Sequence, residues 1–229
     1  MMMPLLRKPK WVVLANGDFP THELPLSFLK KAEKIICCDG ATQHLLEYGL
    51  QPDFIIGDMD SISDEIKKHF SLQIIEDSSQ ETNDLTKALD FCCKKQVWNE
   101  ITIVGATGKR EDHTLGNIAL LTRFVRNMEI QLLTDHGIFV SIEKTTTLES
   151  YPKQQISIFN LTPNVSISST NLAYPLQNRL LNYWWEGTLN EATEDQFTIK
   201  INYSCFQENI ARVIIFREYP KDKISSRRR

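Results

Sequence analysis

Apolar runs of strand length alternate with segments of helical periodicity over the first 140 residues or so. The runs lie at residues 11–15, 34–38, 54–56, 72–76, 101–104 and 130–133. The helical segments, in which apolar residues recur at i, i+3, i+4 or i+7, lie at 41–48, 85–92 and 115–125. Strands that alternate with helices favour an α/β domain, a doubly wound, mostly parallel sheet with helices on both faces. We expect this domain to span residues 1–142.

A different rhythm follows, in which the helical spacing stops and short stretches alternate apolar with polar residues. These stretches lie at 155–159, 165–168, 196–201 and 212–216. Alternation with period two, broken by turn residues such as Pro163 and Asn164, is typical of an all-β domain, here a small antiparallel β-sandwich. We expect the sandwich to span residues 143–218 and the basic residues 219–229 to form a frayed tail.

The bulk composition excludes some partners. The 229 residues are 41% hydrophobic and 24% charged, which is ordinary for a globular protein. A net charge of -3 gives no sign of a nucleic-acid partner, and no apolar run approaches the length of about 18 residues that a membrane span needs. The five cysteines, an odd number without zinc-site spacing, favour reduced core residues and a cytoplasmic protein.

The segment 52–61 carries the most distinctive local pattern. Its apolar run ends at Gly57, and two carboxylates follow at Asp58 and Asp60. Ligands of open α/β sheets bind beyond the carboxyl ends of the strands, where these acids are expected. If the backbone stays extended, both side chains point the same way, as a hard cation such as magnesium requires. In the alternative interpretation, Asp60 and Ser61 cap the helix that residues 64–68 indicate.

Further acidic residues follow other strands of the first half. If the sheet is parallel, its carboxyl edge gathers Asp18, Asp39, Asp58, Asp60, Asp84 and Asp112. Carboxylates in such a group repel one another unless a cation or basic side chains neutralise them. The sequence therefore predicts a divalent-metal site at this edge.

Residues 105–113 resemble a phosphate cradle, because small residues allow close approach of backbone N–H groups and a helix N-terminus follows. The spacing from Gly105 to Gly108 is too short for a Walker A loop. Arg110 suits bidentate phosphate binding, and Lys87 and His113 are further candidates. A surface turn with an ordinary charged cluster is the alternative interpretation of this segment.

The aromatic stretch at 183–185 leaves several interpretations open. Aromatic rings beside small polar residues can stack on a flat cationic ring. They can equally fill a sandwich core or a subunit interface, and the residues alone favour the interface.

Four segments together identify a resemblance to a known family. They read Cys-Asp-Gly-Ala at 38–41, Pro-Asp-Phe-Ile-Ile-Gly-Asp-Met-Asp-Ser at 52–61, Thr-Asn-Asp-Leu-Thr-Lys-Ala-Leu at 82–89 and Gly-Ala-Thr-Gly-Lys-Arg-Glu-Asp-His-Thr-Leu-Gly-Asn at 105–117. In this order and spacing the chain resembles the thiamine pyrophosphokinases over roughly residues 12–217. The resemblance implies an α/β catalytic domain that binds ATP, a thiamine-binding β-sandwich, and a homodimer with its active site at or near the subunit interface. It also implies transfer of the diphosphoryl group of ATP to the hydroxyl of thiamine, which leaves AMP.

The resemblance assigns roles to individual residues. It implies magnesium ligands at Asp58, Asp60 and Asp84. It implies a catalytic set made of these three acids with Lys87, Arg110 and Asp112. It implies nucleotide contacts from Asn16, Asp39, Gly40, Gln80, Thr82, Gly108, Arg110 and His113. It implies thiamine contacts from Trp185, Thr188 and Asn190.

The chain departs from the family pattern at two places in the second half. Leu189 stands where the family commonly has a serine, and Ala173 stands where it has a lysine. Two other functions therefore remain open from the sequence. One is a diphosphokinase that acts on another alcohol, such as a pterin, and the other is a nucleotide- or vitamin-binding module without turnover.

Overall fold

The computed structural model describes residues 2–4, 6–203 and 210–220, and the chain divides into two compact units. The first unit is Leu6–Asp135, and the second is formed by the chain from His136 onward and by the start of the chain. The division lies a few residues before the boundary at 142 that the sequence indicates. Most of the tail expected at 219–229 lies outside the described residues, as does Cys205.

The first unit is built on a six-stranded parallel sheet with the order β7-β6-β2-β3-β4-β5. The strands are β2 (Trp11–Leu14), β3 (Lys34–Cys38), β4 (Phe54–Gly57), β5 (Ile74–Glu76), β6 (Ile101–Val104) and β7 (Ile130–Leu133). The chain adds β3, β4 and β5 on one side of β2 and then returns to place β6 and β7 on the other side. The strand order therefore reverses between β2 and β6, where sheets of this kind leave a crevice for ligands.

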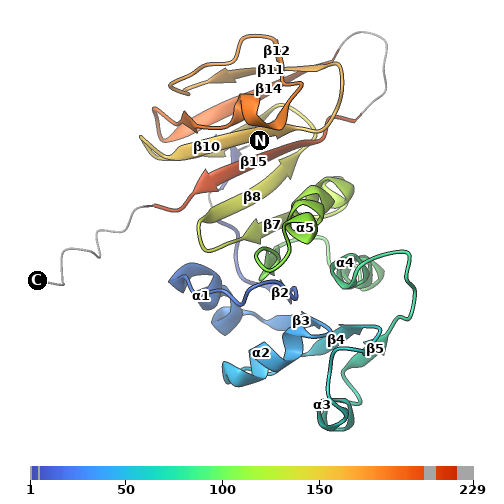
Figure 1. The fold of residues 1–229 in the computed structure, drawn as a ribbon. Coiled ribbons are helices and arrows are strands. Elements are labelled where there is room, and N and C mark those ends of the chain that lie inside the picture. The colour runs from blue at the N-terminus through green and yellow to red at the C-terminus, as the bar shows by residue number, and fades with distance from the viewer. Residues whose placement is uncertain (1, 5, 204–209, 221–229) are drawn as a thin grey trace, which may run out of the picture. The chain divides into compact units, whose positions relative to one another are not determined.

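Five helices cover this sheet, with α4 and α5 on one face and α1 and α2 on the other (Figure 1). They are α1 (Glu23–Lys31), α2 (Ala41–Glu47), α3 (Asp64–His69), α4 (Asp84–Lys94) and α5 (Glu111–Phe124). Strand residues such as Val13, Ile36 and Ile103 are fully buried, because a strand covered on both faces has no side open to solvent. The predicted doubly wound sheet is confirmed.

Two local predictions in this unit are wrong. Leu72 was expected in a strand, but its side chain is 96% exposed and β5 begins at Ile74. The turn that Gln73 and Ile74 close onto the Phe70 carbonyl holds Leu72 outside the sheet. In α5 the predicted apolar face includes Leu115, which is half exposed. This helix instead buries Leu121 and Phe124, so its local periodicity did not identify the face that packs.

The second unit contains two sheets made largely of antiparallel strands. One has the order β13-β10-β15-β8, and in the other, β1-β9-β14-β11-β12, only β1 pairs in parallel. The strands are β1 (Met2–Met3), β8 (Gly137–Ile142), β9 (Thr146–Glu149), β10 (Gln155–Asn160), β11 (Val165–Thr170), β12 (Arg179–Leu180), β13 (Asn190–Glu191), β14 (Gln196–Tyr203) and β15 (Val213–Glu218). Alternate residues such as Ile156 and Ile158, or Phe197 and Ile199, are buried, as in a sandwich core. The predicted all-β second half is confirmed.

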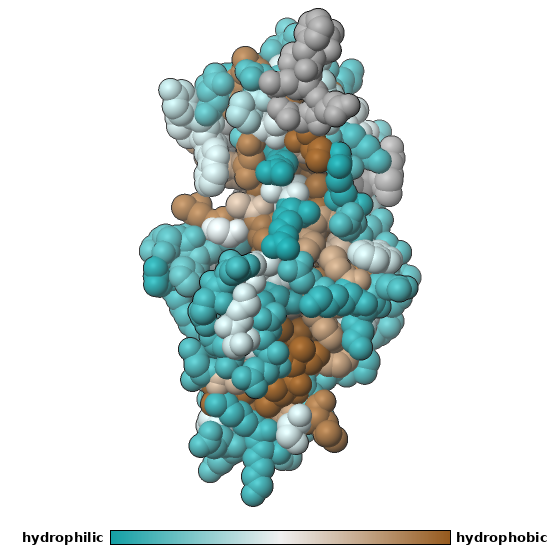
Figure 2. Space-filling view, turned by 90° about the vertical axis from the view of Figure 1, so that its right-hand side faces the viewer, coloured by the Kyte–Doolittle hydropathy of each residue, from teal (hydrophilic) through white to brown (hydrophobic). Residues whose placement is uncertain are grey.

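The surface and the cysteines complete this description. Hydrophilic side chains cover most of the face seen in Figure 2, and hydrophobic residues show between them in patches. None of the described helices has the length and apolar character to cross a membrane. Cys37, Cys38, Cys92 and Cys93 are free thiols; Cys37 and Cys92 are buried as the sequence indicates, and Cys38 is buried as well.

Candidate functional site

A cavity of about 410 Å³ lies at the carboxyl edge of the parallel sheet, where the strand order reverses. Its walls come from the loops that follow β2 and β6, from the end of β4, and from the first turn of α4. Nine residues assigned from the sequence line it: Asn16, Asp58, Gln80, Thr82, Asp84, Lys87, Gly108, Arg110 and His113. The fold thus gathers segments that are up to about 100 positions apart in the sequence.

The loops after β2 and β6 form one continuous wall of the cavity. The backbone N–H of Gly17 donates to the Gly105 carbonyl at 2.7 Å, and that of Asp18 donates to the Thr107 carbonyl at 2.8 Å. Gly108 has φ 80°, and a Cβ there would lie 2.0 Å from Oδ2 of Asp18. Only glycine fits this approach without displacing the acid, so the two loops hold each other in place.

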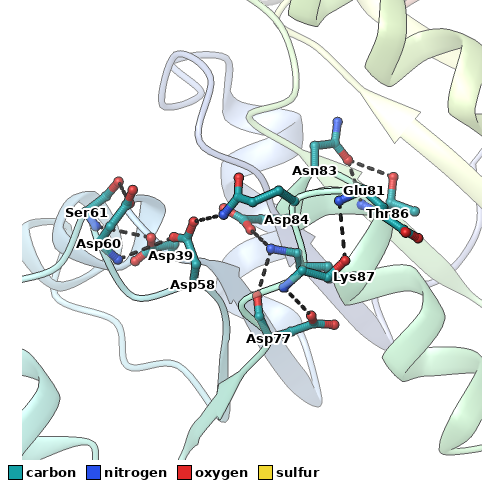
Figure 3. A network of polar contacts seen from close by, with 12 residues as sticks. Asp39, Asp58, Asp60, Ser61, Asp77, Glu81, Asn83, Asp84, Thr86 and Lys87 are labelled. Carbon is teal, nitrogen blue, oxygen red and sulfur yellow. Dashed lines mark hydrogen bonds and ion pairs between the residues drawn. The ribbon is translucent and has the colours of Figure 1, made fainter.

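Three carboxylates converge beside this wall. One oxygen each from Asp39, Asp58 and Asp60 lies within 4.8 Å of the other two. Asp39 follows β3, whereas Asp58 and Asp60 follow β4, so the neighbouring carboxyl ends of these strands bring the acids together (Figure 3). This arrangement confirms the predicted acidic edge for three of its six acids, whereas Asp112 is instead paired with Arg110.

The backbone between Asp58 and Asp60 is not extended, so that part of the prediction is wrong. Met59 has φ 65°, in the left-handed region, and its side chain packs with Ile55 and Ile66 in a core cluster. Burial of Met59 therefore sets a turn, and Oδ1 of Asp58 accepts from the Asp60 N–H at 3.4 Å. The two carboxylates converge through this turn rather than through strand alternation.

The capping alternative for Asp60 and Ser61 is also wrong. The N-cap of α3 is Ser63, whose hydroxyl accepts from the Ile66 N–H at 3.3 Å. Ser61 instead donates from its hydroxyl to Asp60 at 2.7 Å and from its N–H to Oδ2 of Asp39 at 3.2 Å. Both residues therefore belong to the acidic cluster.

Asp39 is the most buried acid of the cluster. Its side chain is 2% exposed, and its Oδ1 has no hydrogen-bond partner among the described residues. Burial, to which the nearby carboxylates of Asp84, Asp60 and Asp58 add, raises the pKa of Asp39 to about 6. A buried oxygen without a donor, beside two further carboxylates, suits a hard divalent cation that takes oxygen ligands. The residues present therefore fit magnesium.

Asp84 flanks this set and pairs with a buried lysine. Its Oδ1 accepts from Nζ of Lys87 at 3.2 Å, and the same ammonium donates to the Asp77 carbonyl at 2.8 Å (Figure 3). Burial raises the pKa of Asp84, although the lysine opposes that shift. A Cβ at Gly57 would touch both Asp39 and Asp84, so both acids pack against that glycine. Gln80 completes the group by donating to Oδ2 of Asp58 at 3.1 Å.

The basic end of the loop after β6 is exposed. Arg110 forms a bidentate ion pair with Asp112, with a shortest N–O distance of 2.5 Å. This pair lowers the pKa of Asp112 to about 2. Lys109 donates to the backbone and side-chain oxygens of Asn16 at 3.2 and 3.1 Å. Gly40 packs against the side chain of Asn16, because a Cβ at Gly40 would be 2.6 Å from Nδ2 of Asn16.

Several residues that line the cavity have no role assigned from the sequence, among them Asn83, Lys109 and Asn117. Each of the three lies within a segment that carries the family resemblance, and this is the one feature of the sequence that could have indicated a functional role. Hydrogen bonding by a surface asparagine depends on neighbours that the sequence does not specify.

The residues expected to contact thiamine lie in the second unit. Trp185 is 70% exposed and stacks on Tyr183 at 6.3 Å, so these rings do not fill the sandwich core, and that interpretation is wrong for them. Asn190 is buried, and its amide bonds both the N–H and the carbonyl of Tyr174, at 3.1 and 2.7 Å. Thr188 donates to the Trp185 carbonyl at 2.7 Å. The thiamine contacts stay predictions.

Comparison with known proteins adds independent findings. The model of the thiamin pyrophosphokinase catalytic domain matches residues 26–133, and that of the substrate-binding domain matches residues 137–206. The chain is 34% identical over 202 residues to thiamine pyrophosphokinase 1 of Oryza sativa subsp. japonica, covering 75% of each chain. It is 31% identical over 157 residues to thiamine pyrophosphokinase of Bacillus subtilis, covering 61% of this chain and 69% of the relative.

Solved structures give the same picture for the fold. The crystal structure of thiamine pyrophosphokinase from Bacillus subtilis superposes with a TM-score of 0.73 at 26% identity, covering 91% of this chain and 99% of the other. The structure of thiamin pyrophosphokinase from Candida albicans superposes with a TM-score of 0.75 at 19% identity, covering 95% and 93%. At that lower identity the likeness concerns the fold alone.

Proposed function

We propose that this chain transfers the diphosphoryl group of ATP to the hydroxyl of thiamine, giving thiamine diphosphate and AMP. The chain belongs to the thiamin pyrophosphokinase family. The family matches confirm the resemblance that the sequence motifs indicate. The observation that carries the proposal is the cavity at the switch point, which joins an acidic cluster to a loop suited to phosphates. Phosphoryl transfer depends mainly on positioning and on neutralising charge on oxygen, and these groups serve both needs.

We propose that Asp58 and Asp60 hold magnesium together with Asp39, and that Asp84 completes the site. The proximity of three carboxylates and the unpartnered buried oxygen of Asp39 support this assignment. When bound, magnesium supplies positive charge that orients the phosphates of ATP and stabilises charge on their oxygens. The set implied by the resemblance, Asp58, Asp60 and Asp84, is thereby extended by Asp39.

The remaining cavity residues are proposed to bind ATP. The small residues around Gly108 let backbone N–H groups approach phosphate oxygens, and Arg110 offers a bidentate guanidinium that Asp112 orients. Lys87 lies at the base, where it fixes Asp84 and adds positive charge. Further nucleotide contacts are proposed for Asn16, Asp39, Gly40, Gln80, Thr82 and His113.

The thiamine site, the assembly and the compartment are also proposals. The exposed rings of Trp185 and Tyr183 and the exposed Leu189 offer an apolar surface in the second unit. We propose that this surface contributes to a homodimer and, with Thr188 and Asn190, to thiamine binding near the subunit interface. Sedimentation velocity of the full chain tests the dimer. The four free cysteines of the described chain support a reducing, cytoplasmic compartment.

The activity is tested by incubating the protein with ATP, magnesium and thiamine and separating the products. AMP and thiamine diphosphate in equal amounts support the proposal. AMP that forms only with a pterin alcohol would assign the chain to another diphosphokinase. ATP binding without any AMP would identify a binding module and refute the enzyme.

The metal assignment is tested by Asp58→Asn, which keeps the shape of the side chain and removes its charge. We expect turnover to fall by at least about 100-fold, because the loss of a ligand exceeds the losses typical of outer-shell partners. The melting temperature should change little, since Asp58 is partly exposed. Asp64→Asn in the exposed first turn of α3 is the matched control, with turnover preserved. Full turnover of Asp58→Asn contradicts the assignment.

A further inference from the structure

The first turn of α4 is held by an asparagine cap whose side chain uses both of its polar atoms. Oδ1 of Asn83 accepts from the Thr86 N–H at 2.9 Å and from the Thr86 hydroxyl at 2.7 Å (Figure 3). Its Nδ2 donates to Oδ1 of Asn117 at 3.2 Å. The cap therefore reaches across to α5, although capping alone would need only the oxygen.

Asn117 continues this chain of hydrogen bonds to the loop after β6. Its Nδ2 donates to the carbonyl of Ala106 at 2.9 Å. Ala106 lies two positions before Gly108, in the wall of the cavity, and both asparagines line the cavity as well. Two side chains thus connect the helix that carries Asp84 and Lys87 with the loop that carries Gly108 and Arg110.

The direction of this relay is fixed at both ends by backbone groups. The Thr86 N–H can only donate, so the oxygen of Asn83 must face it and the amide nitrogen must face Asn117. The Ala106 carbonyl can only accept, so the nitrogen of Asn117 must face it and the oxygen must face Asn83. The two constraints are compatible, because they leave the Asn83 nitrogen to donate to the Asn117 oxygen. Each position therefore needs a side chain with one donor and one acceptor, and asparagine provides both. Aspartate has no donor, and leucine has neither group.

We propose that Asn117 is a positioning residue that sets the distance between the acidic side of the cavity and its phosphate-binding loop. This inference rests on the proposed function. Asn117 acts through Asn83 and Ala106 and not on the transferred group. Loosening the relay would let the two sides of the cavity shift against each other. Such a loss affects the transition state more than substrate binding, so kcat falls more than KM for ATP rises.

The experiment is a double-mutant cycle on kcat with ATP, magnesium and thiamine. Asn117→Leu removes both hydrogen bonds at nearly constant volume. Asn83→Ser keeps an oxygen that caps α4 but removes the donor to Asn117. We expect each single variant to lower kcat by roughly tenfold and the double variant to lose at least threefold less than the product of the two, because they break the same connection. Thr122→Val, which removes a hydrogen bond to the Ala119 carbonyl within α5, is the matched control with unchanged kcat.

Independent, multiplicative losses in the cycle overturn the relay, and so does a KM effect without a kcat effect. Melting temperatures are measured throughout, and Asn117→Ser replaces Asn117→Leu if the leucine variant does not fold. A wild-type protein that forms no AMP refutes the proposed function and not the relay. In that case the same cycle is measured on the free energy of unfolding in urea, where additivity overturns the hydrogen-bonded relay and coupling supports it.

Discussion

Gly57→Ala tests the geometry of the acidic edge most directly. Gly57 ends β4, and a Cβ at this position would lie 2.7 Å from Cβ of Asp39 and 3.1 Å from Cγ of Asp84. Ordinary contact begins near 3.4 Å, so the methyl group must move Asp39 by about 0.7 Å and Asp84 by about 0.3 Å. The contact with Asp39 is at its Cβ, next to the backbone, whereas Asp84 is met at Cγ and at the terminal Oδ1, which lies 3.2 Å away. The substitution therefore displaces both acids without removing either charge.

The expected loss follows from these displacements. Overpacking of this kind destabilises a fold by about 1–3 kcal/mol, and the positive φ of Gly57, 159°, adds backbone strain in the alanine variant, so thermal unfolding is measured to confirm that the variant is folded. A misplacement of about 1 Å lowers a rate by about 100-fold, so we expect kcat to fall by roughly 10- to 100-fold. The magnesium concentration for half-maximal turnover should rise, since the carboxylates no longer converge.

The assay is steady-state turnover against magnesium concentration, with thermal unfolding in parallel. Gly116→Ala in α5 is the matched control, because a Cβ there meets nothing within 4 Å. Alanine in place of a helical glycine stabilises by up to about 1 kcal/mol and should leave turnover unchanged. If Gly57→Ala keeps kcat within twofold of wild type at every magnesium concentration, the two acids that pack against Gly57 do not form one site.

Two further predictions concern stability. Because burial raises the pKa of Asp39 from 3.8 to about 6, this residue favours the folded state fully below pH 4 and loses that contribution as the pH rises through 6. At about 1.4 kcal/mol per unit, the loss reaches at most about 3 kcal/mol in the metal-free protein. Urea unfolding of chelator-treated Asp39→Asn should show that this part of the pH dependence is gone, and an unchanged pH profile would contradict the burial argument. Asn190→Ala should lower the free energy of unfolding by about 1–3 kcal/mol, because the two hydrogen bonds between the buried Asn190 amide and the Tyr174 backbone are lost. A melting temperature equal to wild type would show that these groups find other partners.

Much of the site followed from the sequence because parallel strands place their carboxyl ends at one edge. Local motifs indicate Asp58, Asp84, Lys87 and Arg110, the family resemblance adds Gln80, and the structure brings all five to one cavity. Leu72 and Leu115 show the limit of local pattern, because both are apolar and both are exposed. The exposure of Leu72 depends on the turn before β5, and that of Leu115 depends on which face of α5 packs. Both are determined by residues that are distant in sequence.

The sequence by itself determined the two architectures, the order of strands and helices, and the family. Hydrophobic periodicity is a local property, and the motifs keep their spacing in the linear chain. Only the tertiary structure decided which of the acids expected at this edge form a close group, namely Asp39, Asp58 and Asp60. Only the tertiary structure showed that a left-handed turn at Met59 brings the last two together, and that Asn117 connects α4 to the loop after β6. The contacts of Asp39 and Asn117 join residues that are distant in sequence, and the turn at Met59 depends on the burial of its side chain. Each of these features forms only when the whole core packs.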